Sequence, residues 1–126
     1  MPEPRLLVVE DDAALADLFV TALADEGYAV DHATSSEQAI ALLGSQPPDA
    51  YALVLTNPFV SVRDDPYAQL ANLRAATTAP IVICSGHPAA RYADYPARGY
   101  AAFLQEPFDL QDLINLVASL TNGRGE

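Results

Sequence analysis

The segment LVLTNPFVS, residues 53–61, is the part of the sequence from which the fold can be worked out. Its first four residues are apolar or β-branched, as in a buried strand, and Pro58 stops the strand because proline lacks a backbone N–H. In open α/β folds, ligands and reacting groups lie just beyond the carboxyl ends of the strands. Asn57 holds that position here, although a carboxamide neither ionises nor attacks.

Length and charge limit the class of protein. The 126 residues suit a single domain spanning residues 1–126. The chain has no lysine and a net charge of −11, which argues against binding to nucleic acid or to an anionic membrane. Its one cysteine, Cys84, excludes an intrachain disulfide and indicates a reducing compartment. No signal peptide and no apolar run of about 20 residues is present, so we expect a cytoplasmic protein.

Apolar runs and helical spacing alternate along the whole chain. The predicted strands are residues 6–9, 28–33, 51–56, 80–85 and 100–104. The predicted helices are residues 13–26, 35–44, 66–76, a short helix between Pro88 and Pro96, and 110–122, with caps at Asp12, Ser35, Asp65 and Asp109. This alternation predicts a flavodoxin-like α/β fold, a doubly wound (βα)5 unit with a five-stranded parallel sheet flanked by helices on both faces.

Polar residues follow four of the predicted strands. Because the carboxyl ends of parallel strands share one edge, these residues are expected to lie near one another. They are Glu10 and Asp11 after the first strand, Asn57 after the third, Ser85 at the end of the fourth and Glu106 after the fifth. An adjacent acidic pair at this edge favours an ion site over chance, and Ser85 could equally cap a turn.

The order of these blocks resembles a known family. The segments LLVVEDDAALADLFVTALADEG, PDAYALVLTNPFVS and GYAAFLQEPFDLQDLINLV are similar, in order and spacing, to bacterial response-regulator receiver domains. The resemblance implies a carboxylate after the third strand that takes a phosphoryl group from a histidine kinase, and an acidic pair that helps to hold Mg²⁺. It further implies a hydroxyl ending the fourth strand, a lysine after the fifth and a switch aromatic within the fifth.

The family pattern is only partly kept. Glu10 and Asp11 match the acidic pair, Ser85 the hydroxyl position and Phe103 the switch aromatic. Asn57 stands at the phosphoacceptor position and Glu106 at the lysine position. The resemblance therefore implies an atypical, degenerate member of the family, a pseudo-receiver.

The two departures remove the phosphorylation chemistry that the resemblance implies. An amide cannot form the acyl phosphate that a carboxylate forms, so Asn57 is no nucleophile. Phosphoryl transfer also needs cations, and Glu106 supplies the opposite charge. With no nucleophile–base pair and no cofactor fingerprint, no catalytic residue and no enzymatic activity are predicted. The hypothesis is a signalling module that works by protein–protein contact.

Alternative functions remain open. Another carboxylate, Asp11 or Asp12, could accept phosphate in a phosphorelay, or the chain could bind a small molecule or a metal ion. A small-molecule site ranks lower because no glycine-rich loop follows the first strand. For a metal, Glu10, Asp11 and the Asn57 oxygen could bind Mg²⁺ or Ca²⁺ weakly, since hard cations prefer oxygen ligands. The other expectation is that the pocket holds only water and that the chain has no cofactor.

Two further predictions follow from the resemblance. The Glu106–Pro107 peptide bond is expected to be cis, as is usual in the family. The family's partner face includes the fourth helix and the fifth strand, which here carry Tyr92, Tyr95, Arg98 and Tyr100. Tyrosine and arginine are enriched in interfaces, although these tyrosines could equally cover a broken helix. The expected partner is a histidine kinase, an output protein or a second copy in a homodimer.

Overall fold

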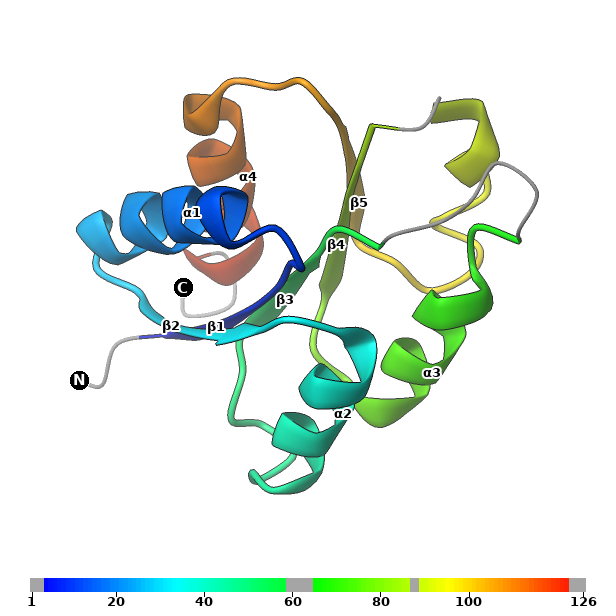
Figure 1. Ribbon diagram of the computed structural model, residues 1–126, viewed down its shortest axis with the longest axis horizontal. Helices are drawn as coiled ribbons and strands as arrows, with labels where there is room; N and C mark the ends of the chain where they lie inside the picture. The colour runs from blue at the N-terminus through cyan, green and yellow to red at the C-terminus, as the bar shows by residue number, and fades with distance from the viewer. Residues whose placement is uncertain (1–3, 59–64, 87–88, 123–126) are drawn as a thin grey trace.

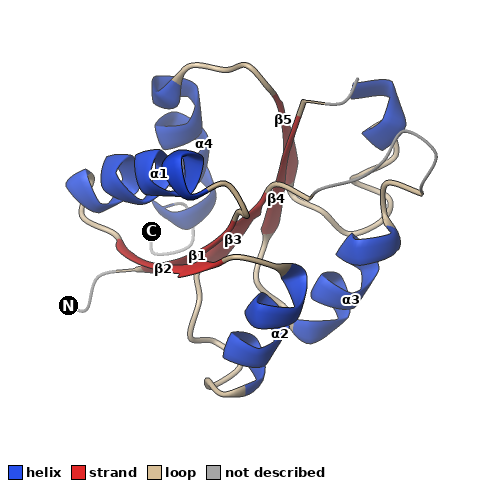
Figure 2. Ribbon diagram, viewed as in Figure 1, coloured by secondary structure: helices blue, strands red, loops and turns tan. Residues whose placement is uncertain are grey.

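The computed structural model describes residues 4–58, 65–86 and 89–122. A five-stranded sheet runs through the molecule, with every neighbouring pair parallel and the strand order β2-β1-β3-β4-β5 (Figures 1 and 2). The strands are β1 (Arg5–Val9), β2 (Ala29–Ala33), β3 (Leu53–Thr56), β4 (Ile81–Ser85) and β5 (Ala102–Gln105). The helices are α1 (Ala13–Asp25), α2 (Ser36–Gly44), α3 (Ala68–Ala76), the 3₁₀ segment η1 (Ala89–Tyr92) and α4 (Leu110–Asn122).

Helices cover both faces of the sheet. Figure 1 shows α1 and α4 on one face and α2 and α3 on the other. Alternate strand residues face opposite ways, so Leu6 and Val8 pack with Phe19 of α1, while Leu7 and Val9 join the second core. The predicted flavodoxin-like, doubly wound parallel fold is confirmed. No helix in the described ranges is long and apolar enough to cross a membrane.

Capping side chains fix the starts of two helices that lead away from the strand ends. Asp12 Oδ1 accepts from the Leu15 N–H at 3.0 Å at the start of α1, and Ser35 Oγ accepts from the Gln38 N–H at 3.1 Å at the start of α2. Both caps agree with the sequence, because short polar side chains satisfy the free amides of a first turn.

The start of α3 differs from its prediction. Asp65 was expected to cap this helix, but α3 begins at Ala68 with Tyr67 in the capping position. The Asp65 carboxylate accepts from the Tyr67 N–H at 3.0 Å and so closes a turn before the helix. Aspartate side chains commonly bond to an amide two residues ahead, and this local bond competes with helix capping.

The short helix predicted between Pro88 and Pro96 forms as a 3₁₀ segment in the described part of the chain. Only the 3₁₀ segment η1 forms, and the chain then continues in turns to Gly99, which has a φ of 95°. Pro96 lacks a backbone N–H and cannot continue a helix, and the positive φ at Gly99 is a conformation that glycine adopts without strain. As a result β5 begins at Ala102, two residues later than expected.

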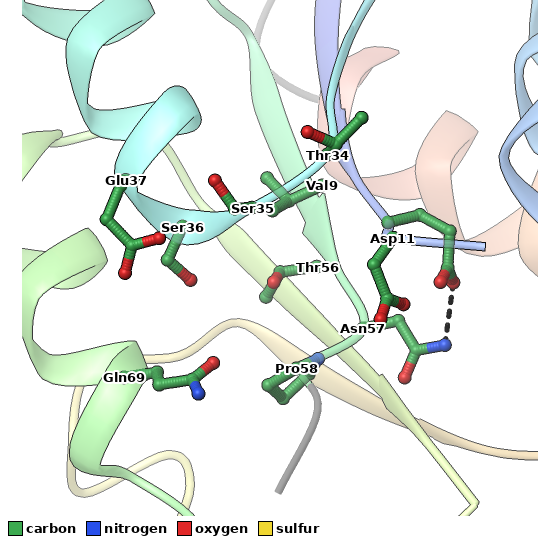
Figure 3. Close-up of a pocket in the computed structure, with 11 residues that line it drawn as sticks. Val9, Asp11, Thr34, Ser35, Ser36, Glu37, Thr56, Asn57, Pro58 and Gln69 are labelled. Atoms are coloured by element: carbon green, nitrogen blue, oxygen red, sulfur yellow. Dashed lines mark hydrogen bonds between the residues drawn. The ribbon is translucent and has the colours of Figure 1, made fainter. Parts of the chain in front are cut away.

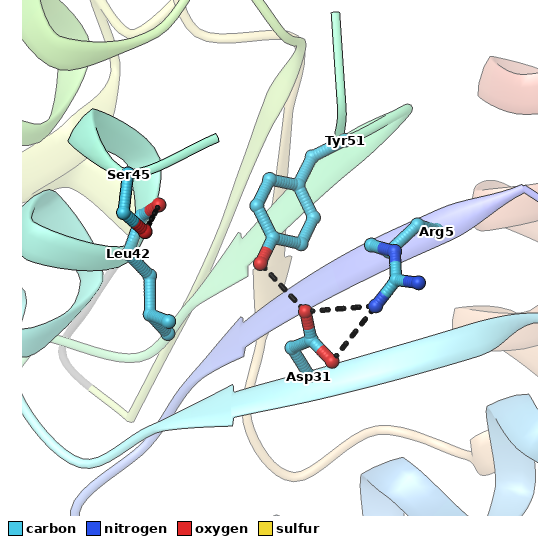
Figure 4. A network of polar contacts seen from close by, with 5 residues as sticks. All are labelled: Arg5, Asp31, Leu42, Ser45 and Tyr51. Carbon is cyan, nitrogen blue, oxygen red and sulfur yellow. Dashed lines mark hydrogen bonds and ion pairs between the residues drawn. The ribbon is translucent and has the colours of Figure 1, made fainter. Parts of the chain in front are cut away.

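A polar network fastens the amino-terminal edge of the sheet. Arg5 of β1 pairs with Asp31 of β2, with Nη1 at 3.1 Å from Oδ2, and the Tyr51 hydroxyl before β3 donates to the same oxygen at 2.6 Å (Figure 4). Burial, followed by the Asp31 carboxylate, raises the pKa of Tyr51 to about 12. The phenol therefore stays a donor at neutral pH and joins three strands.

Candidate functional site

The parallel pairing of β1 and β3 brings Glu10 and Asn57 together. Val9 and Thr56 are register partners, so the residues that follow them leave the sheet side by side. The Asn57 backbone N–H donates to the Val9 carbonyl at 3.0 Å, which extends the ladder by one bond. The Asn57 side-chain Nδ2 donates to Glu10 Oε1 at 2.7 Å (Figure 3). Asn57 thus works as a hydrogen-bond donor to the first acidic residue.

Glu10 is buried, and both of its carboxylate oxygens have donors. Glu10 is only 2% exposed, and its Oε2 accepts a hydrogen bond from the Asp12 N–H at 3.0 Å. Burial raises the pKa of Glu10, whereas the Asp12 amide and the Asn57 carboxamide lower it and the nearby Asp11 raises it. Burial is the largest of these effects. In the described part of the chain, the two donors to this carboxylate are both neutral.

His32 supports the same residue from β2. Its Nε2 lies 2.8 Å from the Glu10 carbonyl oxygen, which is a hydrogen bond when Nε2 carries the proton. The sequence analysis did not assign His32 to the site. The signal was present in the predicted parallel sheet, because parallel strands end at one edge, and in the structure His32 near the end of β2 pairs with Val8 near the end of β1.

A hollow of about 180 Å³ opens beside Asn57, between the strand ends and the start of α2. Figure 3 shows Asp11 and Asn57 on one side and Ser36, Glu37 and Gln69 on the other. Its lining residues are Val9, Glu10, Asp11, Thr34, Ser35, Ser36, Glu37, Thr56, Asn57, Pro58 and Gln69. The Thr56 hydroxyl is fully buried and has no hydrogen-bond partner among the residues that the structure describes. No sequence signal pointed to this hydroxyl, because threonine is also common in strands.

Ser85 and Glu106 lie at the ends of β4 and β5 and are not among the residues lining this hollow. Ser85 is buried, and its carbonyl accepts from the Glu106 N–H at 2.8 Å. Glu106 Oε1 lies 4.0 Å from the place that a Cβ on Gly86 would take, so its side chain turns back over the end of β4. The predicted pocket is therefore divided, with Glu10, Asp11 and Asn57 in one part and Ser85 and Glu106 in the other.

Glu10 and Glu106 are alike in that burial raises the pKa of each carboxyl group. Burial raises the pKa of Glu106, and no charged group within residues 4–58, 65–86 and 89–122 lowers it. Burial also raises the pKa of the Cys84 thiol between these strand ends, with Glu106 and then Glu10 adding to the rise. Both carboxylates are thus close enough to act on Cys84, and no cation of the described residues offsets either of them.

The fifth strand carries the remaining predicted features. The Glu106–Pro107 peptide bond is cis, in agreement with the sequence analysis. Phe103 is partly buried, and its ring stacks against Tyr92 with the centroids 5.1 Å apart and against Tyr95 at 6.5 Å. Phe103 is therefore part of the packing beneath η1.

The predicted partner face needs a correction. Tyr92 is 0% exposed and Tyr100 is 5% exposed, so both belong to the core and cannot form a contact surface. Tyr95 is half-buried against the same cluster, and only Arg98 of the four is exposed. The prediction placed these side chains on the short fourth helix and the fifth strand. Because that helix is reduced to η1, their rings fill the space between the chain and the sheet.

The residues named as a weak metal site offer few free oxygens. Both carboxylate oxygens of Glu10 already accept hydrogen bonds, and Asn57 turns its nitrogen toward Glu10. Within the described ranges, no group of three His, Cys, Asp or Glu side chains could hold a metal ion. A cation at this edge would compete with the Asn57 and Asp12 donors for Glu10, and the described residues give it no preformed set of three ligands.

A family model supports the resemblance seen in the sequence. The model of the response regulator receiver domain matches residues 6–118, which is most of the chain. No curated protein sequence matches the chain at a comparable level.

Solved structures share the fold over nearly the whole chain. A response regulator receiver protein from Sinorhizobium medicae WSM419 is 29% identical, covering 97% of each chain, with a TM-score of 0.78. A two-component response regulator from Clostridium difficile is 21% identical, covering 98% of this chain and 100% of that one, with a TM-score of 0.83. NtrX from Brucella abortus, solved in complex with ADP, is 26% identical with a TM-score of 0.80, and 96% of this chain matches 27% of that protein.

Proposed function

The chain belongs to the response regulator receiver domain family, and from this premise we propose that it signals by protein–protein contact without phosphorylation at Asn57. Receiver domains act in two-component signalling with histidine kinases and output domains as partners. Under this proposal the chain acts in two-component signalling but is not switched by phosphorylation. It is then a pseudo-receiver whose partners recognise a single conformation.

One observation carries the proposal, and it is the hydrogen bond from Asn57 Nδ2 to Glu10 Oε1. Covalent phosphorylation needs a nucleophile that can be ionised or activated by a base. The Asn57 carboxamide at the end of β3 can neither be ionised nor be activated by a base. It also donates a hydrogen bond to Glu10, which matches the acidic pair that helps to hold Mg²⁺ in the family. Asn57 and Glu10 therefore form a closed pair that holds the ends of β1 and β3 together.

Glu106 supports the same proposal independently. A phosphoryl group brings negative charge, which enzymes stabilise with cations and hydrogen-bond donors. At the position of the family's lysine stands a carboxylate whose pKa is raised by burial. A phosphoryl group nearby would add like charge to a partly buried anion, which is unfavourable.

A weak Mg²⁺ site in the wild-type chain is an open part of the proposal. Mg²⁺ prefers carboxylates together with substrate phosphates and water, and it requires near-octahedral geometry. With Glu10 held by Asn57 and Asp12, the exposed carboxylates at the hollow are those of Asp11, beside Glu10, and Glu37, at the start of α2. We expect calorimetric titration with MgCl₂ to give no binding heat. A stoichiometric binding curve would instead establish the weak site at Glu10, Asp11 and Asn57.

An apolar groove between α1 and residues 106–110 favours a function in protein–protein contact. Leu18 of α1 is 47% exposed, an unusual degree for a large apolar side chain of this protein. It lines a groove of about 250 Å³ together with Leu15, Phe19, Glu106, Pro107, Phe108 and Leu110. Exposed apolar patches on monomeric proteins mark contact sites more often than chance. A histidine kinase, an output protein or a second copy of the chain could cover this groove.

The direct test is intact-mass analysis after incubation with acetyl phosphate and Mg²⁺. The wild-type chain is expected to keep its mass. The double variant Asn57→Asp/Glu106→Lys restores the acceptor and the cation, and it is expected to gain the roughly 80 Da of a phosphoryl group. The single variant Glu106→Lys is the matched control, since it supplies the cation without the acceptor.

The same experiment decides between the proposal and its phosphorelay rival. A stoichiometric adduct on the wild-type chain would overturn the proposal, and peptide mapping would then locate the acceptor at Asp11, Asp12 or elsewhere. Asp12 is a weak candidate because its Oδ1 already accepts from the Leu15 N–H at the start of α1. Asp11 is exposed at the hollow and is the stronger of the two.

A further inference from the structure

The hollow beside Asn57 has a negatively charged lining. Three of its lining residues carry carboxylates, Glu10, Asp11 and Glu37, and none of the described lining residues is Arg, Lys or His. The Asp11 carboxylate lies near enough to Glu10 to raise the pKa of that group. Neighbouring carboxylates repel each other unless a positive group compensates them. The charge of the lining therefore favours a cation as the ligand of this hollow.

The first turn of α2 supplies the opposite tendency, and it is the weaker of the two. Ser36 and Glu37 begin this nine-residue helix and line the hollow, and the free amides of a first helical turn attract anions. Their combined effect equals about half an elementary charge. Ser35 already accepts from the Gln38 amide, and Glu37 brings its own carboxylate to the turn. An anion in the hollow would meet three carboxylates, so this helix end does not make it an anion site.

A buried hydroxyl without a partner points to a ligand in the same hollow. Thr56 is 0% exposed, and its Oγ1 has no hydrogen-bond partner in the described part of the chain. Thr56 lines the hollow, and Figure 3 shows it between Ser36 and Asn57. Alternation along β3 places it on the face of Val54, which belongs to the core under α2 and α3. A buried polar atom without a partner costs stability, and a donor in the hollow would satisfy it.

Asn57 adds a second acceptor at the same place. Its Nδ2 donates to Glu10, and its carboxamide oxygen points away from that bond (Figure 3). Within the described ranges this oxygen accepts no hydrogen bond. Val9 and Pro58 are buried apolar residues of the lining. The hollow thus combines acceptors and carboxylates with apolar walls, which suits a weakly hydrated cation that carries several donors.

The placement of the acceptors favours an organic cation over a metal ion. Figure 3 shows Asp11 and Asn57 on one side of the hollow and Glu37 on the other. Mg²⁺ needs all of its ligands at about 2.0–2.1 Å from one point, and the described residues provide no group of three acidic, His or Cys side chains for it. A planar guanidinium directs its N–H groups outward to acceptors on different sides. The volume of about 180 Å³ holds this group, since a water molecule takes roughly 30 Å³.

We propose that this hollow binds the guanidinium group of an arginine, which donates to Thr56 Oγ1 and the Asn57 oxygen and pairs with the Asp11 and Glu37 carboxylates. Glu10 keeps its own two donors and acts through its charge alone. The arginine belongs either to a partner protein or to a small molecule, and a chain of net charge −11 attracts both. The inference rests on the proposed function where a partner supplies the arginine, because it names the chemistry of that contact.

The probe is N-acetyl-L-arginine amide, which presents one guanidinium as an arginine within a chain does. Titration into the isotope-labelled full chain is followed by NMR of the backbone amides. Saturable shifts are expected around Asp11, Glu37 and Asn57, with a dissociation constant on the order of millimolar because the group is small. N-acetyl-L-citrulline amide has the same shape without the charge, and it should not bind. Tighter binding of free L-arginine than of the blocked form would assign the site to a small molecule.

Two variants and a control locate the bound group. Thr56→Val removes the hydroxyl and keeps the shape, and valine suits a strand, so the chain is expected to fold. This variant should bind the probe about fivefold more weakly, since one hydrogen bond is lost. Glu37→Gln should weaken binding by about threefold, as expected for an exposed charge pair. Glu26→Gln removes the same charge at the exposed end of α1 and should change the affinity by less than about twofold.

Several results would overturn this proposal. The absence of saturable shifts is one, and equal binding of the citrulline compound is another. An unchanged affinity of Thr56→Val would show that the hydroxyl meets only water. Equal shifts of the same amides with MgCl₂ at matched ionic strength would identify a metal site instead. The acetyl phosphate assay remains independent, since an adduct on the wild-type chain would reject the phosphorylation-independent function and leave the titration result standing.

Discussion

Two carboxylates at opposite edges of the sheet show two ways of holding an anion in this fold. Glu10 follows β1 at the carboxyl edge, is 2% exposed and has only neutral donors, the Asn57 carboxamide and the Asp12 amide. Asp31 lies in β2 near the amino edge, is partly exposed and has a guanidinium and a phenol as donors, from Arg5 and Tyr51 (Figure 4).

The difference lies in what compensates each charge. A surface ion pair such as Arg5–Asp31 stabilises a protein little, and its loss is tolerated. A buried carboxylate is unfavourable where no cation compensates it, and burial raises the pKa of Glu10, to which the described residues bring no cation. Carboxyl groups with a shifted pKa cluster at functional positions, so Glu10 is the stronger candidate of the two for a functional role.

The largest expected effect is that of Asn57→Asp. The substitution replaces the donor to Glu10 with a second carboxylate, so a hydrogen bond is lost and like charges meet in a partly buried place. We expect the free energy of unfolding to fall by about 2–3 kcal/mol in the absence of divalent cations. Urea denaturation with EDTA measures this change.

The same variant leads to a second prediction, which concerns its thermal stability in the presence of Mg²⁺. In the Asn57→Asp variant three carboxylates, Glu10, Asp11 and residue 57, can share a hard cation, so millimolar MgCl₂ should raise the melting temperature. The wild-type chain should not respond, because its Asn57 keeps the donor in place. Unchanged stability of the variant, or an equal Mg²⁺ response of the wild type, would show that Asn57 does not close the site.

At the other edge, Tyr51→Phe is expected to have a smaller effect. The change removes the 2.6 Å hydrogen bond to Asp31 but keeps the ring, and Arg5 and water remain as partners of the carboxylate. Urea denaturation should show a loss of about 0.5–1 kcal/mol. A loss as large as that of Asn57→Asp would mean that the two edges hold their carboxylates equally strongly, contrary to the comparison.

The sequence predicted the sheet well, because its strands are buried on both faces and read as continuous apolar runs between capped helices. Glu10 and Asn57 were placed at one edge for the same reason, since parallel strands end together. The predicted partner face was wrong because its tyrosines were taken as exposed, although the alternative that they cover a broken helix was also open. Tyr92 and Tyr100 instead fill the core, and only tertiary packing decides between these two outcomes.

The details of the site were beyond sequence reasoning for a different reason. The sequence shows that Asn57 and Glu10 have complementary groups, but the direction in which a side chain points depends on its neighbours. The division of the pocket, with Ser85 and Glu106 apart from the hollow, comes from the way Glu106 folds back over Gly86. The buried Thr56 hydroxyl likewise depends on packing that no local pattern encodes.

The smallest expected effect concerns pH and Glu106. Burial raises its pKa above the ordinary value of 4.5, so between 4.5 and the higher value the folded chain holds a proton that the unfolded chain has lost. Its contribution to stability is therefore full at low pH and is lost as the pH rises through this window. Glu106→Gln removes the titration, so the stability of the variant relative to wild type should increase as the pH rises above 4.5 and should level off once the pH exceeds the raised pKa of Glu106. Glu26→Gln, at the exposed end of α1, removes the same charge from the surface and is the control. If both variants show the same pH profile in urea denaturation, net charge explains the effect and Glu106 is not a buried anion without a cation.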